Sequence, residues 1–333
     1  MKRKTRVLFV RPSATPFIQQ DLEILSRHFD VKVLNVSPEG RTFSAGMRYL
    51  LKLKLGILRS DIVFCWFADI YSEWSVRLAH WLGKKSIVVV GGYEVAKLPE
   101  INYGLMLDED DAKMVKHILD KADKLLAVSD FVKKEIEQYS HGKNVSVVYN
   151  AVDVAGLTPR DKKEDLVVTV GNATKERCAL KGIDTFVKAS LAVPNARFVV
   201  IGGYDDATVA LLKGINPKVE FTGQLPHDEA MVWLERAKVY CQLSKIESFG
   251  MALAESMSLE CVPVVTFEGA MPELVGNAGF YVAYGDIHAA SDAIKKALVS
   301  EKGGEARQRI SQSFSVQVRE AALVSAIERT MLR

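Results

Sequence analysis

The chain has 333 residues, of which 48% are hydrophobic and 26% are charged, and its formal net charge is +3. This length is large for one hydrophobic core and sufficient for two domains of ordinary size. So small a net charge gives no indication of nucleic-acid binding, and the four cysteines lack the spacing of metal or redox sites. We therefore expect a globular protein with buried thiols in a reducing compartment.

The first half of the chain alternates short apolar runs with amphipathic stretches. Apolar runs that do not alternate with polar residues are typical of parallel strands covered on both faces, and the stretches between them are typical of the covering helices. We predict strands at 6–10, 31–34, 62–66, 86–90, 124–128 and 145–148. We predict helices at 17–27, 47–59, 71–82, 112–120 and 130–139.

One of these helical stretches is unusually basic. Residues 1–60 contain 12 Lys and Arg against 4 Asp and Glu, and the stretch 43–59 mixes leucines with Arg48, Lys52, Lys54 and Arg59. A basic amphipathic helix lies either on an anionic membrane or over a sheet with its cations reaching into water. The second arrangement is the commoner one, and we favour it.

The start of the chain lacks the features of an export signal. The apolar run at 7–10 ends at Arg11 and is too short for the core of a signal peptide. No segment approaches the roughly 18 apolar residues of a membrane-spanning helix. We expect a cytoplasmic protein, either free or peripheral on the inner face of the membrane.

A second series of strands follows a polar stretch at 153–165. Strands are predicted at 166–170, 198–201, 219–221, 239–243 and 262–265. Two such series predict an α/β protein with two doubly wound, Rossmann-like domains, at 1–155 and 156–315. Ligands bind at the carboxyl ends of such strands, so a central cleft between the domains is the expected site.

The stretch 245–255 carries the chemistry on which the functional prediction depends. It places Glu247 just before and Glu255 within a predicted helix that starts after the strand 239–243, with Ser248 as a candidate N-cap. The first turn of a helix has unpaired N–H groups and a partial positive charge, so it can hold a phosphate. The candidate donors are the backbone N–H groups of Phe249, Gly250, Met251 and Ala252. Glu247, itself an anion, would then accept sugar hydroxyls, and Glu255 would reach a ribose.

This Glu-x7-Glu pattern with Ser-Phe-Gly, followed by the apolar run 261–265, resembles the retaining family-4 glycosyltransferases of GT-B architecture. The runs 127–133 and 147–153 resemble the family's approach to its interdomain linker. Further similar segments follow in the same order at 170–171, 180–184, 221–226 and 269–275. The resemblance implies a first domain on the acceptor side, a second domain for a nucleotide sugar, and a helix at 316–333 that packs back on the first domain.

The resemblance also implies roles for particular residues. Lys181 would neutralise the donor diphosphate, Glu247 would hold the sugar, and Leu225 would lie beside the base. Gly171, Gly182 and Gly202 would let backbone approach the donor. The arginine usual after the first of these glycines is replaced by Asn172, and either Lys175 or Arg177 would supply the second positive charge. The sequence does not choose between these two cations.

The first domain departs from the family pattern at two loops. The usual glycine pair after the first strand is replaced by a loop with Ser13 and Thr15. Where many members carry a histidine, this chain has Gly91, Gly92, Tyr93 and Glu94. The glycines let backbone approach a ligand, and Glu94 offers a carboxylate. We assign both loops to the acceptor side.

The sequence therefore predicts a metal-independent, retaining glycosyltransferase of the hexosyl type without a cofactor. Its donor would be a nucleotide-diphosphate sugar, and its acceptor a glycan, a lipid-linked group or a small molecule, in keeping with cell-envelope synthesis. The altered first-domain loops leave open a non-catalytic partner subunit that binds sugar or nucleotide. A nucleotide-sugar epimerase of the same architecture is a third alternative. No phosphate-loop or dinucleotide-binding glycine motif follows a strand.

Overall fold

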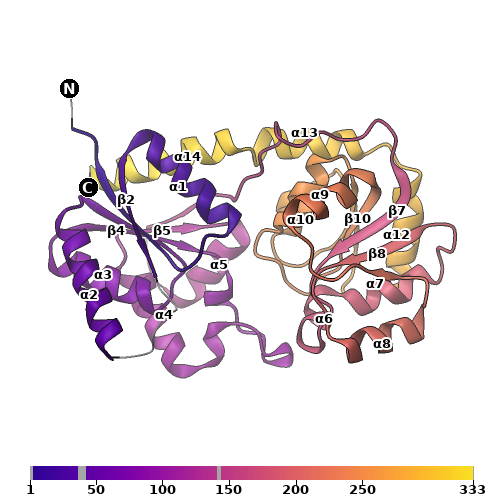
Figure 1. Cartoon of the computed structure of the whole chain (residues 1–333), viewed down its shortest axis with the longest axis horizontal. Coiled ribbons are helices and arrows are strands. Elements are labelled where there is room, and N and C mark those ends of the chain that lie inside the picture. Colours follow the sequence, from indigo (N-terminus) through magenta and orange to yellow (C-terminus); the bar gives the residue numbers. More distant parts are fainter. Residues whose placement is uncertain (1–2, 37–42, 141–143, 333) are drawn as a thin grey trace. The chain divides into compact units, whose positions relative to one another are not determined.

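The computed structural model describes residues 3–36, 43–140 and 144–332. The chain divides into two compact units, one of Met1–Asn150 with Arg319–Arg333 and one of Ala151–Val318. Each unit contains a six-stranded sheet in which all neighbouring strands are parallel, as Figure 1 shows. The predicted fold class, two Rossmann-like α/β domains, is confirmed.

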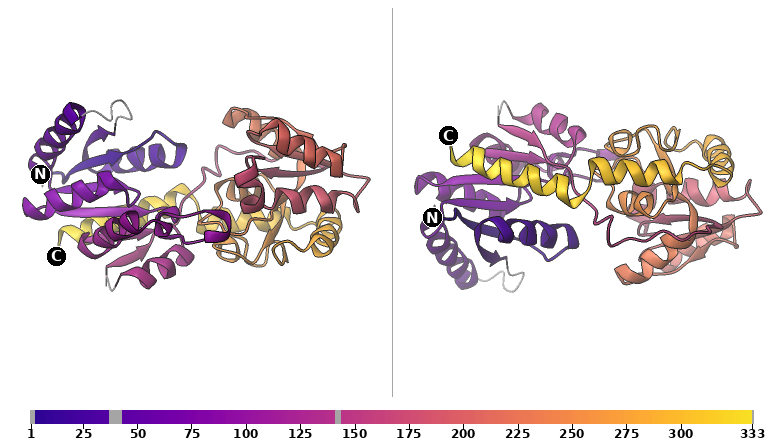
Figure 2. Two further views of the ribbon diagram at one scale, coloured as in Figure 1. Left: turned by 90° about the horizontal axis from the view of Figure 1, so that it is seen from below. Right: turned by 90° about the horizontal axis from the view of Figure 1, so that it is seen from above.

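The first unit has the strand order β2-β1-β3-β4-β5-β6. Its central strands β3 and β4 are buried almost throughout because helices cover both faces of the sheet (Figure 2). The strands are β1 (Arg6–Arg11), β2 (Asp30–Asn35), β3 (Ile62–Trp66), β4 (Lys85–Val90), β5 (Lys124–Ala127) and β6 (Val145–Val147). The helices are α1 (Pro16–His28), α2 (Phe43–Leu58), α3 (Ile70–Trp81), α4 (Glu109–Lys121), α5 (Asp130–Tyr139) and α14 (Val316–Met331), with short 3-10 turns at Tyr93–Val95, Pro99–Ile101 and Leu105–Leu107.

The second unit has the strand order β12-β11-β10-β7-β8-β9. Its strands are β7 (Glu164–Val170), β8 (Arg197–Ile201), β9 (Glu220–Phe221), β10 (Ala237–Gln242), β11 (Val262–Thr266) and β12 (Phe280–Val282). Its helices are α6 (Lys175–Lys181), α7 (Ile183–Ser190), α8 (Asp206–Ile215), α9 (His227–Arg236), α10 (Met251–Ser258), α11 (Met271–Val275), α12 (Ile287–Leu298) and α13 (Gly303–Ser313).

The predicted strands all occur, with boundaries shifted by a few residues. Strand β12 was not predicted, because its three residues at the edge of the sheet give too short an apolar run to stand out. None of the helices in the described ranges is long and apolar enough to cross a bilayer.

A buried ion pair ties α14 to the first unit, along which it lies in Figure 2. Arg319 Nη2 donates to Asp21 Oδ2 of α1 at 2.7 Å, and both side chains are at most 2% exposed. Trp66 Nε1 donates to the same carboxylate at 3.0 Å. Arg319 Nη1 also donates to the carbonyl oxygens of Val148 and Tyr149, which follow β6. This single guanidinium therefore joins α14, α1 and the segment after β6.

Breaking this pair is expected to destabilise the first unit strongly. Arg319→Met would leave the Asp21 carboxylate buried and almost unpaired, at a cost of about 3–5 kcal/mol. The double variant Asp21→Asn/Arg319→Met should lose less than the sum of the single losses, since it leaves no buried charge. Urea unfolding followed by tryptophan fluorescence in a Trp233→Phe background measures the stability of the first unit. The other three tryptophans, at positions 66, 74 and 81, all lie in that unit.

The matched control joins the same two helices at the surface. Arg27 of α1 contacts Glu320 of α14 at 2.6 Å, with the Arg27 side chain 51% exposed. Arg27→Met should cost at most about 1 kcal/mol, because exposed ion pairs contribute little. Equal losses for Arg27→Met and Arg319→Met would contradict the structural role assigned to the buried pair.

Candidate functional site

Glycines hold the carboxyl ends of the strands in the second unit close together. A Cβ added to Gly182, whose φ is +64°, would lie 2.0 Å from the carbonyl oxygen of Leu243. A Cβ on Gly202 would lie 2.5 Å from the carbonyl oxygen of Gly171. A Cβ on Gly269 would lie 2.3 Å from the carbonyl oxygen of Glu247. The loops after β7, β8, β10 and β11 thus meet at distances that only glycine permits.

This packing brings Lys181 and Glu247 together, although they are 66 positions apart in the sequence. Lys181 Nζ donates to Glu247 Oε2 at 2.9 Å, and the two side chains are 26% and 18% exposed. The stem of Lys181 lies over Gly171, where a Cβ would be 3.2 Å from Lys181 Cγ. Lys181 ends α6, and Gly182 separates it from α7. The structure thus brings the two principal predicted residues into direct contact.

A network of hydrogen bonds between buried polar side chains leads to the Glu247 carboxylate. Gln242, the last residue of β10, donates from Nε2 to Ser244 Oγ at 2.6 Å and to Glu247 Oε2 at 3.3 Å. Tyr240 donates its hydroxyl to Gln242 Oε1 at 2.9 Å, and burial raises the pKa of this tyrosine well above its usual value. Sequence analysis missed these residues, since a lone Gln at a strand end gives no signal. Their contacts fix the orientation of the Glu247 carboxylate.

The predicted helix after Glu247 occurs as α10, but its N-cap differs from the prediction. Ser248 is not the N-cap, because α10 begins after Gly250. The φ of Gly250 is +95°, a value that suits glycine, and no side chain caps this end of the helix. The first helical hydrogen bond runs from Ala254 N to the carbonyl oxygen of Gly250. The N–H groups of Met251 and Ala252 precede it and have no acceptor within the helix. The side chain of Phe249 is buried against Phe314, with the rings 5.8 Å apart.

Glu255 is engaged by a histidine that sequence analysis passed over. His227 Nε2 lies 2.9 Å from Glu255 Oε1, and this hydrogen bond raises the pKa of His227 above 6.5. His227 begins α9, directly after the loop with half-buried Leu225. The structure therefore brings the predicted base loop and the predicted ribose ligand together.

The two alternative cations belong to one short helix. Lys175 and Arg177 are both exposed residues of α6. At the start of α6, Asp205 Oδ2 accepts from Lys175 N at 3.1 Å, and the helix ends where Gly182 enters the left-handed region. The structure does not choose between the two residues.

In the first unit, Glu94 joins the ends of β3 and β4. Its Oε1 accepts from Ala68 N at 3.1 Å and from Gly91 N at 3.0 Å. Its Oε2 is buried and has no partner among the described residues. Burial raises the pKa of Glu94, and burial also raises the pKa of neighbouring Asp69 to about 6. Glu94 therefore links the backbone after β3 to the backbone after β4, and burial makes its carboxyl group harder to ionise.

The other predicted acceptor-side residues lie at the same edge of the sheet. Gly92 has φ of +112°, and Tyr93 is 44% exposed with its ring 5.0 Å from that of Tyr103. Ser13 is exposed and Thr15 precedes α1, with its buried Oγ1 unpartnered in the part of the chain that the structure describes. These loops follow β1 and β4, which flank β3 in the sheet.

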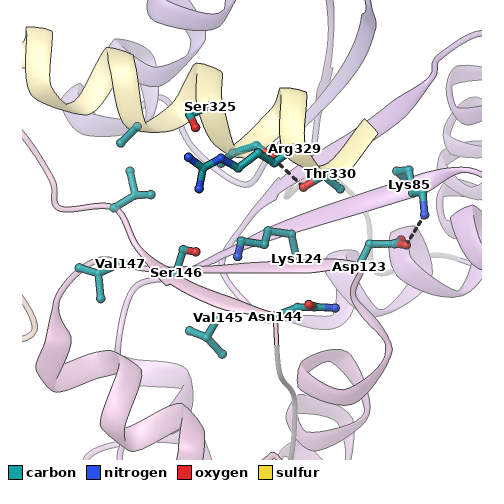
Figure 3. Close-up of a pocket in the computed structure, with 13 residues that line it drawn as sticks. Lys85, Asp123, Lys124, Asn144, Val145, Ser146, Val147, Ser325, Arg329 and Thr330 are labelled. Atoms are coloured by element: carbon teal, nitrogen blue, oxygen red, sulfur yellow. Dashed lines mark hydrogen bonds and ion pairs between the residues drawn. The ribbon is translucent and has the colours of Figure 1, made fainter. Parts of the chain in front are cut away.

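A cavity of about 560 Å³ lies at the opposite edge of the first unit's sheet. Figure 3 shows it between α14 and the amino ends of β4, β5 and β6, with Lys124, Ser146 and Arg329 on its walls. None of the predicted site residues lines this cavity. Ligands of parallel α/β sheets bind at the carboxyl ends, so this cavity is not the expected sugar site. Within the described ranges, no group of three or more His, Cys, Asp or Glu side chains is arranged to hold a metal ion.

Known proteins share both halves of this architecture. Residues 2–155 match a family model described as "Glycosyltransferase Family 4", and residues 157–314 match one described as "Glycosyl transferases group 1". N-acetyl-alpha-D-glucosaminyl L-malate synthase of Bacillus anthracis is 24% identical over 224 residues, which span 60% of this chain and 58% of that relative. The aligned segment is thus less than two thirds of the relative's length.

Solved structures resemble the whole chain. The Anabaena HepE protein in complex with UDP and glucose has a TM-score of 0.77 at 15% identity, with 98% of this chain and 100% of that chain covered. Sucrose-phosphate synthase from Thermosynechococcus elongatus has a TM-score of 0.76 at 15% identity, with 98% and 99% covered. At this identity the likeness shows the fold, which is that of GT-B glycosyltransferases. The two successive family matches, over residues 2–155 and 157–314, show that the chain belongs to glycosyltransferase family 4.

Proposed function

We propose that this protein transfers a hexose from a nucleotide-diphosphate sugar to an acceptor hydroxyl with retention of anomeric configuration. The observation that carries the proposal is the contact of Lys181 with Glu247, 2.9 Å long, beside the start of α10. It brings together a cation for a phosphate, a carboxylate for sugar hydroxyls and the backbone N–H groups at a helix start, which have no acceptor within the helix.

The donor would replace the resting ion pair. Its diphosphate takes Lys181 and the N–H groups of Met251 and Ala252, while sugar hydroxyls donate to Glu247. Glu255 accepts from the ribose, and the base lies beside Leu225. Lys175 or Arg177 adds a second positive charge. No metal and no cofactor is needed in this scheme, since the lysine and the helix start offset the phosphate charge.

Transfer breaks the bond between the anomeric carbon and the phosphate oxygen and forms a bond to the acceptor oxygen on the same face. Negative charge grows on the departing phosphate as that bond breaks, and Lys181 stabilises it there. The acceptor hydroxyl loses its proton to the departing phosphate, so no protein nucleophile takes part. Glu247 holds the sugar in the orientation that this step requires.

The HepE structures support a uridine nucleotide as the first donor to test, because that protein of the same fold binds UDP and glucose. On the acceptor side we assign the loops with Ser13, Thr15 and 91–94. Glycans, lipid-linked groups and small molecules are all candidate acceptors, with cell-envelope synthesis as the setting. The proposed location is the cytoplasm or the inner face of the membrane.

A thermal-shift screen of nucleotide diphosphates and their sugars identifies the donor, since ligands that bind the native state raise the unfolding temperature. Slow donor hydrolysis by the same protein then demonstrates activation of the sugar. Tight binding without hydrolysis or transfer would instead indicate a non-catalytic partner subunit. Interconversion of the donor sugar without an acceptor would indicate an epimerase.

Removal of either principal side chain is expected to abolish most activity. Lys181→Met and Glu247→Gln should each lower turnover by about a hundredfold or more, because each loses a contact to the reacting sugar phosphate. If the ion pair were only structural, the double variant would regain activity. We expect that it does not. The matched control is the exposed pair of Asp292 and Lys295 on α12, 3.2 Å apart. Wild-type turnover in either single site variant would refute the assigned roles.

The pairing of His227 with Glu255 predicts a pH effect. The hydrogen bond raises the pKa of His227 above 6.5, so the stability that the pair contributes is complete below pH 6.5 and is lost as pH rises through the folded-state pKa. Saturating UDP should lower the pKa of His227, because the ribose competes for Glu255. Histidine NMR titrations, assigned with His227→Asn, measure this shift. An unchanged pKa would show that the nucleotide does not reach Glu255.

Glu94→Gln tests the raised pKa of the Glu94 carboxyl group, which lies in a loop that we assign to the acceptor side. A carboxyl group with a raised folded-state pKa contributes most stability below its usual value of 4.5 and loses it as pH rises. Gln has no ionised form, and its carbonyl oxygen can still accept from Gly91 N. The unfolding temperature of Glu94→Gln should therefore exceed that of wild type more at pH 8 than at pH 5. A difference that does not depend on pH would contradict a raised pKa of Glu94.

A further inference from the structure

Helix α2 presents two apolar faces, and only one of them is used by the fold. Leu53 and Ile57 are buried in the core of the first unit. Met47, Leu51, Leu55 and Leu58, spaced by four, four and three residues, form a second stripe and are each between 42% and 58% exposed. The expectation that α2 covers the sheet therefore explains its buried face but not the second apolar stripe, which faces water.

Cations border the exposed stripe on both sides. At 3.6 residues per turn, Arg48, Lys52 and Arg59 lie along one side of it and Lys54 lies along the other. All four are exposed, and α2 contains no Asp or Glu from Phe43 to Leu58. The stripe is therefore apolar at its centre and positive at its margins.

A second exposed stripe continues this surface on α3. Ile70, Trp74 and Trp81 share one face of α3, and Trp81 is 70% exposed. Lys54 Nζ lies 5.2 Å from the centre of the Trp81 ring, so the cation that borders the first stripe rests on the second. The rings of Tyr49 and Tyr71 also meet, 5.4 Å apart. The two helices lie side by side in Figure 1.

We infer that this α2–α3 surface (Met47, Leu51, Leu55 and Leu58 with Ile70, Trp74 and Trp81) docks on an anionic lipid bilayer. An apolar helix face with Lys and Arg at its margins fits the boundary between acyl chains and headgroups, and tryptophan favours that depth. Protein interfaces, in contrast, are depleted in lysine. The cations complement anionic headgroups, and the binding is peripheral because the stripes lie on surface helices.

Vesicle flotation without any substrate tests this inference independently of the proposed function. The wild-type protein should float with vesicles of phosphatidylglycerol and phosphatidylcholine, more weakly at high salt, and should not float with phosphatidylcholine alone. The charge variant Arg48→Gln/Lys52→Gln/Arg59→Gln should weaken binding by about a hundredfold, at roughly fivefold per cation. The apolar variant Met47→Gln/Leu51→Gln/Leu55→Gln should weaken it at least about tenfold.

The matched control carries Leu211→Gln and Val299→Gln, which replace apolar residues 75% and 83% exposed in the second unit. It should bind vesicles as wild type does. Vesicles should also shift the tryptophan emission of wild type to shorter wavelength, and Trp74→Phe/Trp81→Phe should remove the shift. Donor hydrolysis should be unchanged in every variant, because the replaced side chains lie outside the donor site, and the unfolding temperature of each variant shows that it is still folded under the assay conditions.

The inference is overturned if the wild-type protein does not float with the anionic vesicles or if the apolar variant floats equally well. It is also overturned if the wild type is a dimer that the apolar variant converts to monomers without any vesicle binding, since a second copy then covers the surface. Each of these outcomes leaves the proposed transfer reaction intact, because donor hydrolysis needs no vesicle.

Discussion

The close approach of backbone segments at the carboxyl ends of the second unit's strands is the constraint on which the site depends. Gly182, Gly202 and Gly269 each stand where a Cβ would lie within 2.5 Å of a carbonyl oxygen. A side chain at any of them would force the loops apart. Because the loops after β7 and β10 touch, a lysine at the end of α6 reaches a glutamate from a distant part of the sequence. The chemistry therefore rests on backbone geometry more than on side-chain packing.

The same constraint explains the charge balance of the site at rest. Lys181 and Glu247 neutralise one another, and the amide of Gln242 supports the carboxylate from behind. A partly buried cation or anion alone would be costly, so each residue keeps the other in place in the resting site. In the proposed reaction a ligand would have to offer both an anion and hydroxyl groups, because a ligand with only one would leave the other side chain unpaired.

Much of this was predictable from the sequence, and the remainder has identifiable causes. Unbroken apolar runs such as 86–90 predicted the parallel strands, and the order of the motifs predicted the family. Contacts between distant residues were not predictable, so His227 and Gln242 were missed. The prediction of Ser248 as the N-cap was wrong, because serine is a common capping residue but the backbone at the actual N-cap, Gly250, has a positive φ. Strand β12 was missed because its apolar run is too short. The exposure of Leu51 and Leu55 was not predictable either, because it depends on which face of α2 meets the sheet.

The ion pair between Asp21 and Arg319 has a consequence for the order in which the protein matures during synthesis. Its two members are 298 positions apart, and the whole second unit is encoded between them. All of the second unit is therefore synthesised before Arg319, whose guanidinium neutralises Asp21. Until then the Asp21 carboxylate of the nascent first unit lacks its main partner. The earlier half of the chain thus becomes fully stable only after the later half has been synthesised.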